Sequence, residues 1–209
     1  MTDQSVIKPV KRRPHARPAE ILAAALDLFA ERGFNATRMQ DVASRAGLSK
    51  AAIYLYFNDK MALLQALVQT TVGNNIGIAK GLAANHQGSV TELLQLVMGF
   101  MAGRVGETRM PDLVKLIISE SRAHPDIGRF YLDNVINQGL PFFESLIARG
   151  VASGEFRAVD PKLAVKSMIA PVLLAALWRT TFEPLGAEPI NMEAFARHNQ
   201  EMLLRGLRP

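Results

Sequence analysis

The stretch LSKAAIYLYFNDK, Leu48 to Lys60, carries the side chains whose chemistry is easiest to interpret. It contains Lys50, Tyr54, Tyr56 and Lys60, and its two tyrosines are among only three in the chain. Tyrosine hydroxyls and lysine ammonium groups donate hydrogen bonds to phosphate oxygens. The small residues next to Lys50 would let a backbone approach nucleic acid closely. This composition indicates binding to a polyanion, although the same aromatic residues also suit the core of a small helical domain.

A helix is expected before this stretch, in the segment RPAEILAAALDLFAERG. Its apolar residues follow one stripe of a 3.6-residue period, at Ile21, Leu22, Ala25, Leu28 and Phe29. Pro18 suits the first turn, where a missing N–H costs nothing. Gly33 suits the left-handed residue that ends the helix.

The segment TRMQDVASRAG predicts a second, shorter helix. Thr37, followed three residues later by Gln40, indicates a capping box at its start. Gly47 breaks this helix, and Ser49 can cap a third helix that runs to about Phe57. The order helix, helix, glycine-containing turn, helix is that of a helix-turn-helix, which places its second helix in the major groove of DNA.

Within the third helix, Ser49, Lys50 and the two alanines lie at the amino end, where base edges are usually met. Tyr54 lies one turn beyond Lys50 and would clamp a phosphate. Phe57 favours the helical core, whereas Tyr56 suits the core and the surface equally.

About 50 residues, from Ala19 to Val68, resemble the DNA-binding domain of the tetracycline-repressor (TetR) family of bacterial transcription regulators. The resemblance includes the pair Gly33-Phe34, the helix-opening Thr37, the core DVASRAGLSKAAIYLYF, and Lys60 with ALL behind it. It implies phosphate contacts by Thr37, Tyr54, Tyr56 and Lys60, base contacts by Lys50, Ala51 and Ala52, and further contacts by Arg38 and Gln40.

Three positions depart from the family pattern. Gln40 stands where arginine is common, Leu55 where an aromatic residue or histidine is common, and Met61 where glutamate is common. Leu55 can offer at most an apolar contact, such as one to a thymine methyl group, so the operator sequence does not follow. The complete set of predicted DNA-binding residues is Arg17, Thr37, Arg38, Gln40, Ser49, Lys50, Ala51, Ala52, Tyr54, Leu55, Tyr56 and Lys60.

Charge is concentrated at the amino end of the 209-residue chain. Residues 1–60 hold ten Lys/Arg against six Asp/Glu, a net +4, whereas the other 149 residues hold fourteen against thirteen, a net +1. This layout is expected if only the first part meets a polyanion, and equally if a basic tail is simply solvated. We predict a flexible basic arm over 1–17, which either enters the minor groove or stays disordered, a DNA-binding domain over 18–62 and a second domain over 63–209.

Residues 63–209 show helical spacing of apolar residues, interrupted by turns, with no strand alternation. The sequence therefore predicts an all-α fold, in which an N-terminal three-helix helix-turn-helix DNA-binding domain precedes a larger helical ligand-binding and dimerisation domain. The resemblance places the dimer helices at Leu163 to Leu177 and at MEAFARHNQEMLLRGL, with an intramolecular core as the alternative. Candidates for the dimer interface are Ala164, Ser167, Met168, Pro171, Ala175 and Trp178.

The inner faces of these helices are rich in aliphatic residues and methionine, which suggests a small apolar or amphipathic effector, or only a core. Candidates for ligand binding are Phe100, Met101, Arg104, Ile117, Glu120, Tyr131, Asn134 and Trp178. The sequence has no cysteine, no metal-ligand spacing among its four histidines, and no nucleotide or nucleophile motif, so neither a cofactor, a metal nor an enzyme is expected.

No secretory signal and no uninterrupted apolar run of membrane-spanning length are present, so a cytoplasmic protein without a membrane partner is expected. The function predicted is a ligand-released homodimeric repressor on a near-palindromic double-stranded DNA operator. A helical protein-interaction adaptor is the alternative. Salt separates the two, because phosphate neutralisation makes DNA binding steeply salt-dependent.

Overall fold

The computed structural model describes residues 17–209, the side chain of Glu107 excepted, and this part contains helices and no strand. The predicted all-α fold is confirmed, while the arm residues 1–16 lie outside the described part. The helices are α1 (Arg17–Ala36), α2 (Met39–Arg45), α3 (Lys50–Ile53), α4 (Lys60–Val68), α5 (Asn74–Asn85), α6 (Val90–Glu107), α7 (Met110–Glu120), α8 (Pro125–Tyr131), α9 (Asn137–Ala152), α10 (Pro161–Leu177) and α11 (Met192–Leu207).

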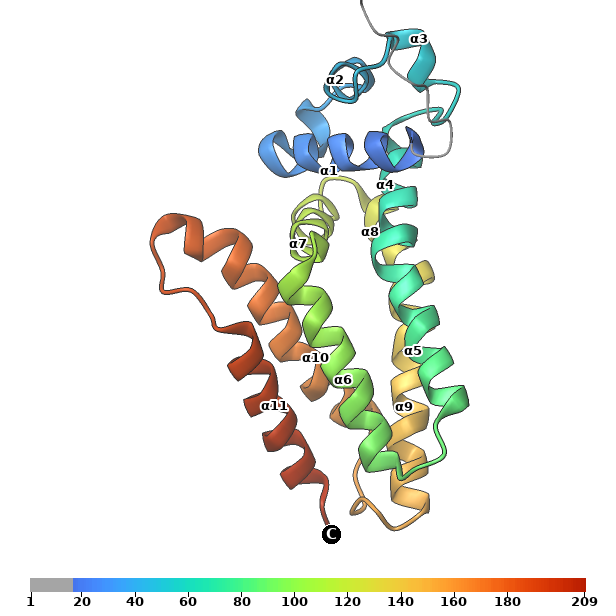
Figure 1. The fold of residues 1–209 in the computed structure, drawn as a ribbon, viewed down its shortest axis with the longest axis vertical. Helices are drawn as coiled ribbons and strands as arrows, with labels where there is room; N and C mark the ends of the chain where they lie inside the picture. Colours follow the sequence, from blue (N-terminus) through green and yellow to red (C-terminus); the bar gives the residue numbers. More distant parts are fainter. Residues whose placement is uncertain (1–16) are drawn as a thin grey trace, which may run out of the picture.

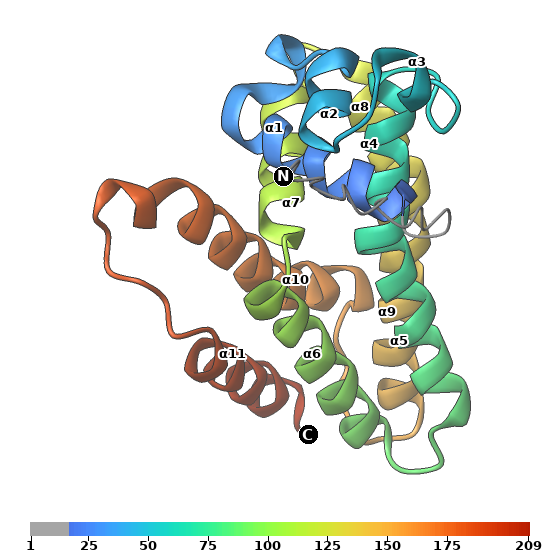
Figure 2. The ribbon, with the colours of Figure 1, turned by 45° about the horizontal axis from the view of Figure 1, so that its top comes forward.

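The first three helices form one end of an elongated molecule, and the remaining helices run along its length (Figure 1). Figures 1 and 2 both place α3 at the end opposite the chain's C-terminus. In Figure 1, α10 and α11 lie on the opposite side of the bundle from α5, and a loop joins them. This arrangement holds the candidate reading helix away from the larger domain.

The helix α1 is not straight, because Gly33 has φ 79° and ψ 169° and interrupts its helical backbone. Residues with a Cβ atom rarely adopt a positive φ, whereas glycine does so without strain. The predicted positive φ is therefore present, although its ψ differs from that of a left-handed helical residue. The bend turns Phe34 back into the core, where it is 6% exposed.

The start of α2 differs from the sequence prediction by one residue. Arg38, not Thr37, has the extended backbone of the N-cap, and its N–H donates to Asp41 Oδ2 at 3.2 Å. The capping box expected between Thr37 and Gln40 is therefore wrong. The reason is that Thr37 already uses its hydroxyl on carbonyls at the end of α1.

One hydrophobic core joins the three-helix unit to the larger domain. It includes Ile21 of α1, Ile53 of α3 and Leu64 of α4, and it continues through Leu113 of α7 to Ala175 of α10. Because the cluster is continuous, the two domains do not pack as independent bodies. The boundary expected after residue 62 falls inside α4.

A connecting helix runs from Lys60 to Asn85, between the three-helix unit and the rest of the chain, with a change of helix type inside it. Residues Gln69–Gly73 form a π-helical segment, η1, between α4 and α5. Two further π segments, η2 (Leu132–Ile136) and η3 (Trp178–Phe182), precede α9 and follow α10, with a short 3-10 helix η4 (Glu183–Leu185) after η3. Such segments in α-helices often mark functional sites.

A carboxylate from a distant part of the chain caps the N-terminus of α6. Glu155 accepts from Val90 N–H at 3.0 Å and from Thr91 N–H at 2.9 Å. These backbone hydrogen bonds lower the pKa of Glu155 below its ordinary value. A carboxylate suits the partial positive charge at a helix N-terminus, so this contact fixes α6 against the turn after α9.

Glu155→Gln should lower stability at neutral pH by about 0.5–1 kcal/mol, toward the small end for a helix cap because solvent screens the carboxylate. A loss of this size shifts Tm by about 1–4 °C in a protein of this length. The lowered pKa means that the stabilisation is present above the ordinary pKa of glutamate and disappears as pH falls through the folded-state pKa. Thermal melts at pH 7 and pH 3 check this: the difference from wild type should be smaller at pH 3 than at pH 7. A constant difference at both pH values, or an equal loss in the exposed-loop control Glu188→Gln, would contradict it.

The segment Pro161–Leu185 is long and apolar enough, by length and composition alone, to cross a membrane, and 22% of its most apolar window is buried. Core helices of water-soluble proteins pass the same test. Its cationic residues Lys162, Lys166 and Arg179 interrupt the apolar run. Most of this apolar window is therefore not buried within the chain.

Candidate nucleic-acid interface and apolar cavity

A short, tightly bonded turn sets the candidate reading helix beside α2. Gly47 has φ 66°, and Leu48 N–H donates to Ala43 O at 2.8 Å. Ser49 then caps α3, with its hydroxyl accepting from Ala52 N–H at 3.2 Å. These are the glycine break and the serine cap expected from sequence, so the helix-turn-helix geometry is local in origin.

The helix α3 is shorter than predicted, because it ends at Ile53 and not near Phe57. The chain continues in turns, in which Tyr56 N–H and Phe57 N–H both donate to Ile53 O at 3.0 Å. Ile53 is fully buried and Phe57 packs against the core, so the interpretation of Phe57 as a core residue is correct.

The outer side of this segment is exposed. Tyr54 is 45% exposed, Leu55 83% and Tyr56 40%, while Lys50 and Ala51 are also exposed and Ala52 is half-buried. Exposed tyrosines beside a lysine and small residues form a surface able to meet phosphates and base edges. At Tyr54 and Tyr56, therefore, the structure favours the surface over the core.

Thr37 is the clearest correction among the predicted contacts. Its side chain is fully buried, and its hydroxyl donates to Gly33 O at 2.8 Å and to Leu28 O at 3.2 Å. The hydroxyl therefore stabilises the junction of α1 and α2 and does not face solvent. A phosphate could meet only the backbone of this residue.

Lys60 is also committed to internal contacts. Its Nζ donates to Phe34 O at 2.7 Å and to Asn35 O at 3.1 Å, and it lies 4.7 Å from the centre of the Phe34 ring. Burial lowers the pKa of Lys60, and the nearby Glu120 opposes that shift. An ammonium group has three donors, so one remains beyond these two carbonyls.

Three other predicted DNA-binding residues, Arg17, Arg38 and Gln40, lie on or beside α1 and α2. Arg38 and Gln40 are exposed at the start of α2. Arg17 at the start of α1 forms an ion pair with Glu20 at 3.1 Å. A separate bidentate pair, from Arg45 to Glu31 at 2.8 and 2.9 Å, ties α2 to α1 and lowers the pKa of Glu31. This pair fixes α2 against α1, and neither of its residues is among the predicted DNA contacts.

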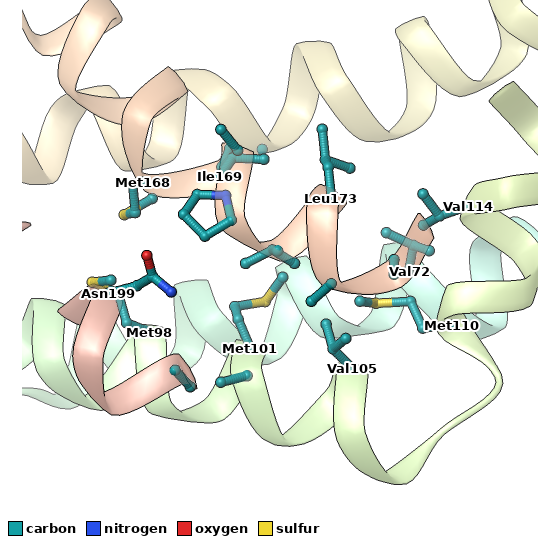
Figure 3. Close-up of a pocket in the computed structure, with 18 of the residues that line it drawn as sticks. Val72, Met98, Met101, Val105, Met110, Val114, Met168, Ile169, Leu173 and Asn199 are labelled. Carbon is teal, nitrogen blue, oxygen red and sulfur yellow. The ribbon is translucent and has the colours of Figure 1, made fainter. Parts of the chain in front are cut away.

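A large apolar cavity of about 1280 Å³ lies in the other domain. It is lined from each of the helices α5 to α11 and from the π segments η1 and η2. Figure 3 shows aliphatic and methionine side chains around it, including Met101, Met110 and Ile169, with Asn199 as the labelled polar residue. Flexible methionine side chains adapt their shape to a ligand.

Three of the predicted ligand-binding residues line this cavity: Met101, Ile117 and Tyr131. Burial raises the pKa of Tyr131, so its phenol stays protonated. The other five do not line it, namely Phe100, Arg104, Glu120, Asn134 and Trp178.

Three polar residues among these five form hydrogen bonds to other groups of the chain. Glu120 Oε1 accepts from Phe34 N–H at 3.1 Å, Asn134 donates to Phe130 O at 2.9 Å, and Trp178 Nε1 donates to Glu188 O at 2.9 Å. None of these three lines the cavity. The sequence analysis missed most residues of the cavity wall, among them Met168, Ile169, Leu173 and Asn199 on α10 and α11.

The predicted dimer residues of α10 divide between two sides of the helix. Met168 and Ala175 are buried within the chain and line the cavity, so a partner subunit cannot reach them. Pro171 also lines the cavity, Ala164 and Trp178 are half-buried, and Ser167 is exposed. The exposed stripe on the side away from the cavity contains Leu163, Ser167 and Leu174. A dimer interface on this side would differ in register from the predicted one.

Metal binding has no support in residues 17–209, where no group of three or more His, Cys, Asp or Glu side chains could hold an ion. The described part offers two surfaces for binding: a polar one with exposed Lys50 on α3 and a partly open apolar cavity.

Comparisons with known proteins agree with both parts. The family "Bacterial regulatory proteins, tetR family" matches residues 21–67, and the family "Tetracyclin repressor-like, C-terminal domain" matches residues 85–191. The uncharacterized HTH-type transcriptional regulator YfiR of Bacillus subtilis is 30% identical over 159 residues, which cover 74% of this chain and 75% of that protein. The HTH-type transcriptional repressor KstR2 of Rhodococcus jostii is 24% identical over 91% of each chain.

Among solved structures, the regulator FadR from Bacillus subtilis in complex with stearoyl-CoA has the same fold, with a TM-score of 0.72 at 19% identity over 91% of this chain and 99% of that chain. The two family matches cover the helix-turn-helix and most of the cavity-bearing domain, and nothing in the comparisons favours an adaptor. The chain therefore belongs to the TetR family of DNA-binding transcriptional regulators.

Proposed function

We propose that this regulator is a homodimeric repressor, which occupies a near-palindromic operator and leaves it when an apolar or amphipathic small molecule fills the cavity. The observation that supports this most directly is the continuous core from Ile53, beneath the reading surface, to Ala175, at the cavity wall. A ligand that reshapes the cavity then acts on packing shared with the DNA-binding unit. A repressor of this kind works in the cytoplasm, where its operator is.

At the operator, Tyr54 and Tyr56 would donate to phosphates while Lys50, Ala51 and Leu55 face the base edges. Their exposure supports these roles. Phosphate contacts fix the register in which base edges are read. Lys60 would contribute its remaining donor, and its main role would be to hold the end of α1 in place.

Dimerisation would occur through the exposed stripe on α10. Leu163 is 60% exposed and Leu174 50%, with Ser167 between them at helical spacing. On α11, Met202 is also exposed, at 60%. A two-fold axis beside these helices would form a four-helix interface and present two copies of α3 to successive turns of DNA.

The effector would be large and mostly apolar. A volume of about 1280 Å³ exceeds the roughly 300–1,000 Å³ of typical small-molecule pockets. A stearoyl-CoA complex in a protein of the same fold supports a long aliphatic ligand. The name KstR2, a ketosteroid regulator in the solved structure from Mycobacterium tuberculosis, supports another bulky apolar class.

The experiment that tests the proposal is a footprint of the purified protein on DNA flanking its own coding region, repeated with candidate hydrophobic metabolites. We expect protection of two half-sites about 10 base pairs apart or a multiple of that spacing, and loss of protection with the effector. Failure to shift any genomic duplex at low ionic strength would overturn the proposal.

Tyr54→Phe should weaken binding to all DNA sequences alike, by about 3- to 10-fold, because one hydroxyl donor to a charged phosphate is lost. Fluorescence anisotropy on the operator and on scrambled duplexes measures this. Tyr131→Phe is the matched control, since that phenol lies in the cavity wall and not on the reading surface. An unchanged affinity of the Tyr54 variant would remove this residue from the phosphate contacts.

A further inference from the structure

A second, smaller hollow of about 330 Å³ lies against the last helix of the chain. It is formed by Gln95 of α6 and by one side of α11, and its lining includes Arg197, Arg205 and Arg208 with Glu201 as the single acidic residue. Three guanidinium groups against one carboxylate make this hollow, here called the arginine cleft, electropositive. Guanidinium groups bind carboxylates and phosphates in bidentate fashion.

The arginine cleft shares part of its wall with the apolar cavity. Arg197 and Gln200 line both, and Gln200 Nε2 donates to Gln95 O at 2.8 Å where α11 crosses α6. A molecule that fills the apolar cavity can therefore place a polar end beside these residues. The two hollows together have the form of a site for one amphipathic ligand.

The arginines are available for exchange with a ligand. Arg197 pairs with Glu193 at 2.8 Å and Arg205 with Glu201 at 2.6 Å, and all four side chains are more than half exposed. Exposed pairs four residues apart on a helix contribute only about 0.3–0.5 kcal/mol, so an anion can replace the glutamates at small cost. Cationic residues in the last turn also favour the helix dipole. That effect accounts for Arg205 and Arg208 but not for Arg197, which lies six residues into the helix.

The arginine cleft lies largely on a different side of α11 from the exposed Met202. At 100° per residue, Arg197 lies roughly 140° around the helix from Met202, and Arg205 roughly 60°. Arg197 is therefore the cleft arginine on α11 that lies farther from a partner covering Met202.

We propose that the arginine cleft binds the anionic head group, carboxylate or phosphate, of an effector whose aliphatic tail occupies the apolar cavity. The inference rests on the proposed effector cavity and adds the chemical class of its ligand. It predicts that an anionic amphiphile binds more tightly than a neutral one of the same chain length.

Equilibrium dialysis of the full chain with dodecanoyl-CoA, dodecanoate and dodecan-1-ol tests the proposal. The double variant Arg205→Ala/Arg208→Ala should lose at least tenfold affinity for an anionic probe and stay within twofold of wild type for dodecan-1-ol. Neither arginine lines the apolar cavity, so the tail site is left intact. Arg205→Lys/Arg208→Lys should recover part of the loss, and Arg122→Ala/Arg129→Ala, exposed arginines outside both hollows, should change nothing.

A loss confined to dodecanoyl-CoA identifies a phosphate-bearing head group, and an equal loss for dodecanoate identifies a carboxylate. The proposal is overturned if the double variant binds every probe as wild type does, or if it loses dodecan-1-ol to the same extent. If wild type binds dodecan-1-ol as tightly as the anionic probes, the proposed head-group site is ruled out, while the proposal of an apolar effector cavity is still supported. If wild type binds none of the probes, the proposed head-group site and the proposed effector cavity are both ruled out.

Discussion

Lys50→Glu should reduce operator affinity at least 100-fold, about 2.7 kcal/mol. The side chain is exposed at the first residue of α3, on the surface that would enter the major groove. A carboxylate there replaces attraction to the phosphate backbone by repulsion in a region of strong negative potential. Fluorescence anisotropy at two salt concentrations measures the loss, which should be larger at low salt.

The folding cost of this change is small, because Lys50 is exposed and an acidic residue suits the first turn of a helix. Lys80→Glu is the matched control: it makes the same charge change at an exposed position of α5, in the larger domain. We expect its operator affinity to stay near that of wild type and both variants to melt like wild type. If Lys80→Glu weakens binding as much as Lys50→Glu, net charge alone explains the loss and α3 is not the reading element.

Lys50→Ala separates two roles within this prediction. A lysine that contacts a base should, when removed, alter the ranking of operator variants. A lysine that contacts only backbone should weaken all of them equally. The measurement is a set of operators that differ at single base pairs.

Local signals were sufficient to predict the DNA-binding unit. Gly47 and Ser49 act through their own backbone and side chain, so their spacing determines the turn wherever the rest of the chain lies. The exposed side of α3 follows from the burial of Ile53. The internal partners of Thr37 and Lys60 did not follow from local signals, because they are backbone carbonyls of Leu28, Gly33 and Phe34, which the bend of α1 brings near.

The larger domain was less predictable for a different reason. The helix α10 is apolar on nearly every side, so periodicity cannot tell the side that lines a cavity from the side that faces a partner. Met168 and Leu174 are equally good candidates for either role from sequence, and only the packing of α6, α7 and α11 separates them. Glu120, similarly, reaches a residue 86 positions away, beyond any local pattern.

Glu120 leads to the second large expected effect, on communication between the cavity and the DNA-binding unit. The helix α7 lines the cavity with Val114 and Ile117 and ends at Glu120, which accepts from Phe34 N–H. Phe34 O in turn accepts from Lys60, the first residue of the connecting helix. A Cβ on Gly33 would lie 3.1 Å from Glu120 Oε1, so a side chain there would crowd this contact.

A second contact runs parallel to this one. His124 Nε2 lies 2.7 Å from Asn35 Oδ1, and the His124 ring meets the Phe34 ring edge-on at 5.5 Å. The end of α1 is thus held between α4 and the segment after α7. A ligand that displaces α7 would move both supports of Phe34, and with them the angle of α3.

Glu120→Ala should therefore uncouple the two sites more than it weakens either. Allosteric coupling of about 1–3 kcal/mol corresponds to roughly 5- to 150-fold changes in affinity. We expect the variant to retain operator affinity within about fivefold without effector, the change that one lost hydrogen bond of about 1 kcal/mol would give. The effector identified by footprinting should then release it less than threefold. Operator titrations with and without saturating effector give both values.

Two further variants separate loss of the hydrogen bond from loss of charge. Glu120→Gln keeps an oxygen that can accept from Phe34 N–H, so its effector response should stay close to that of wild type. Asp126→Ala removes an exposed carboxylate of neighbouring α8 and should have no effect on the response. If Glu120→Ala is released by effector as fully as wild type, the cavity communicates with the DNA-binding unit through the connecting helix alone. In that case, the π segment η1, where Val72 lines the cavity, is the element to alter next.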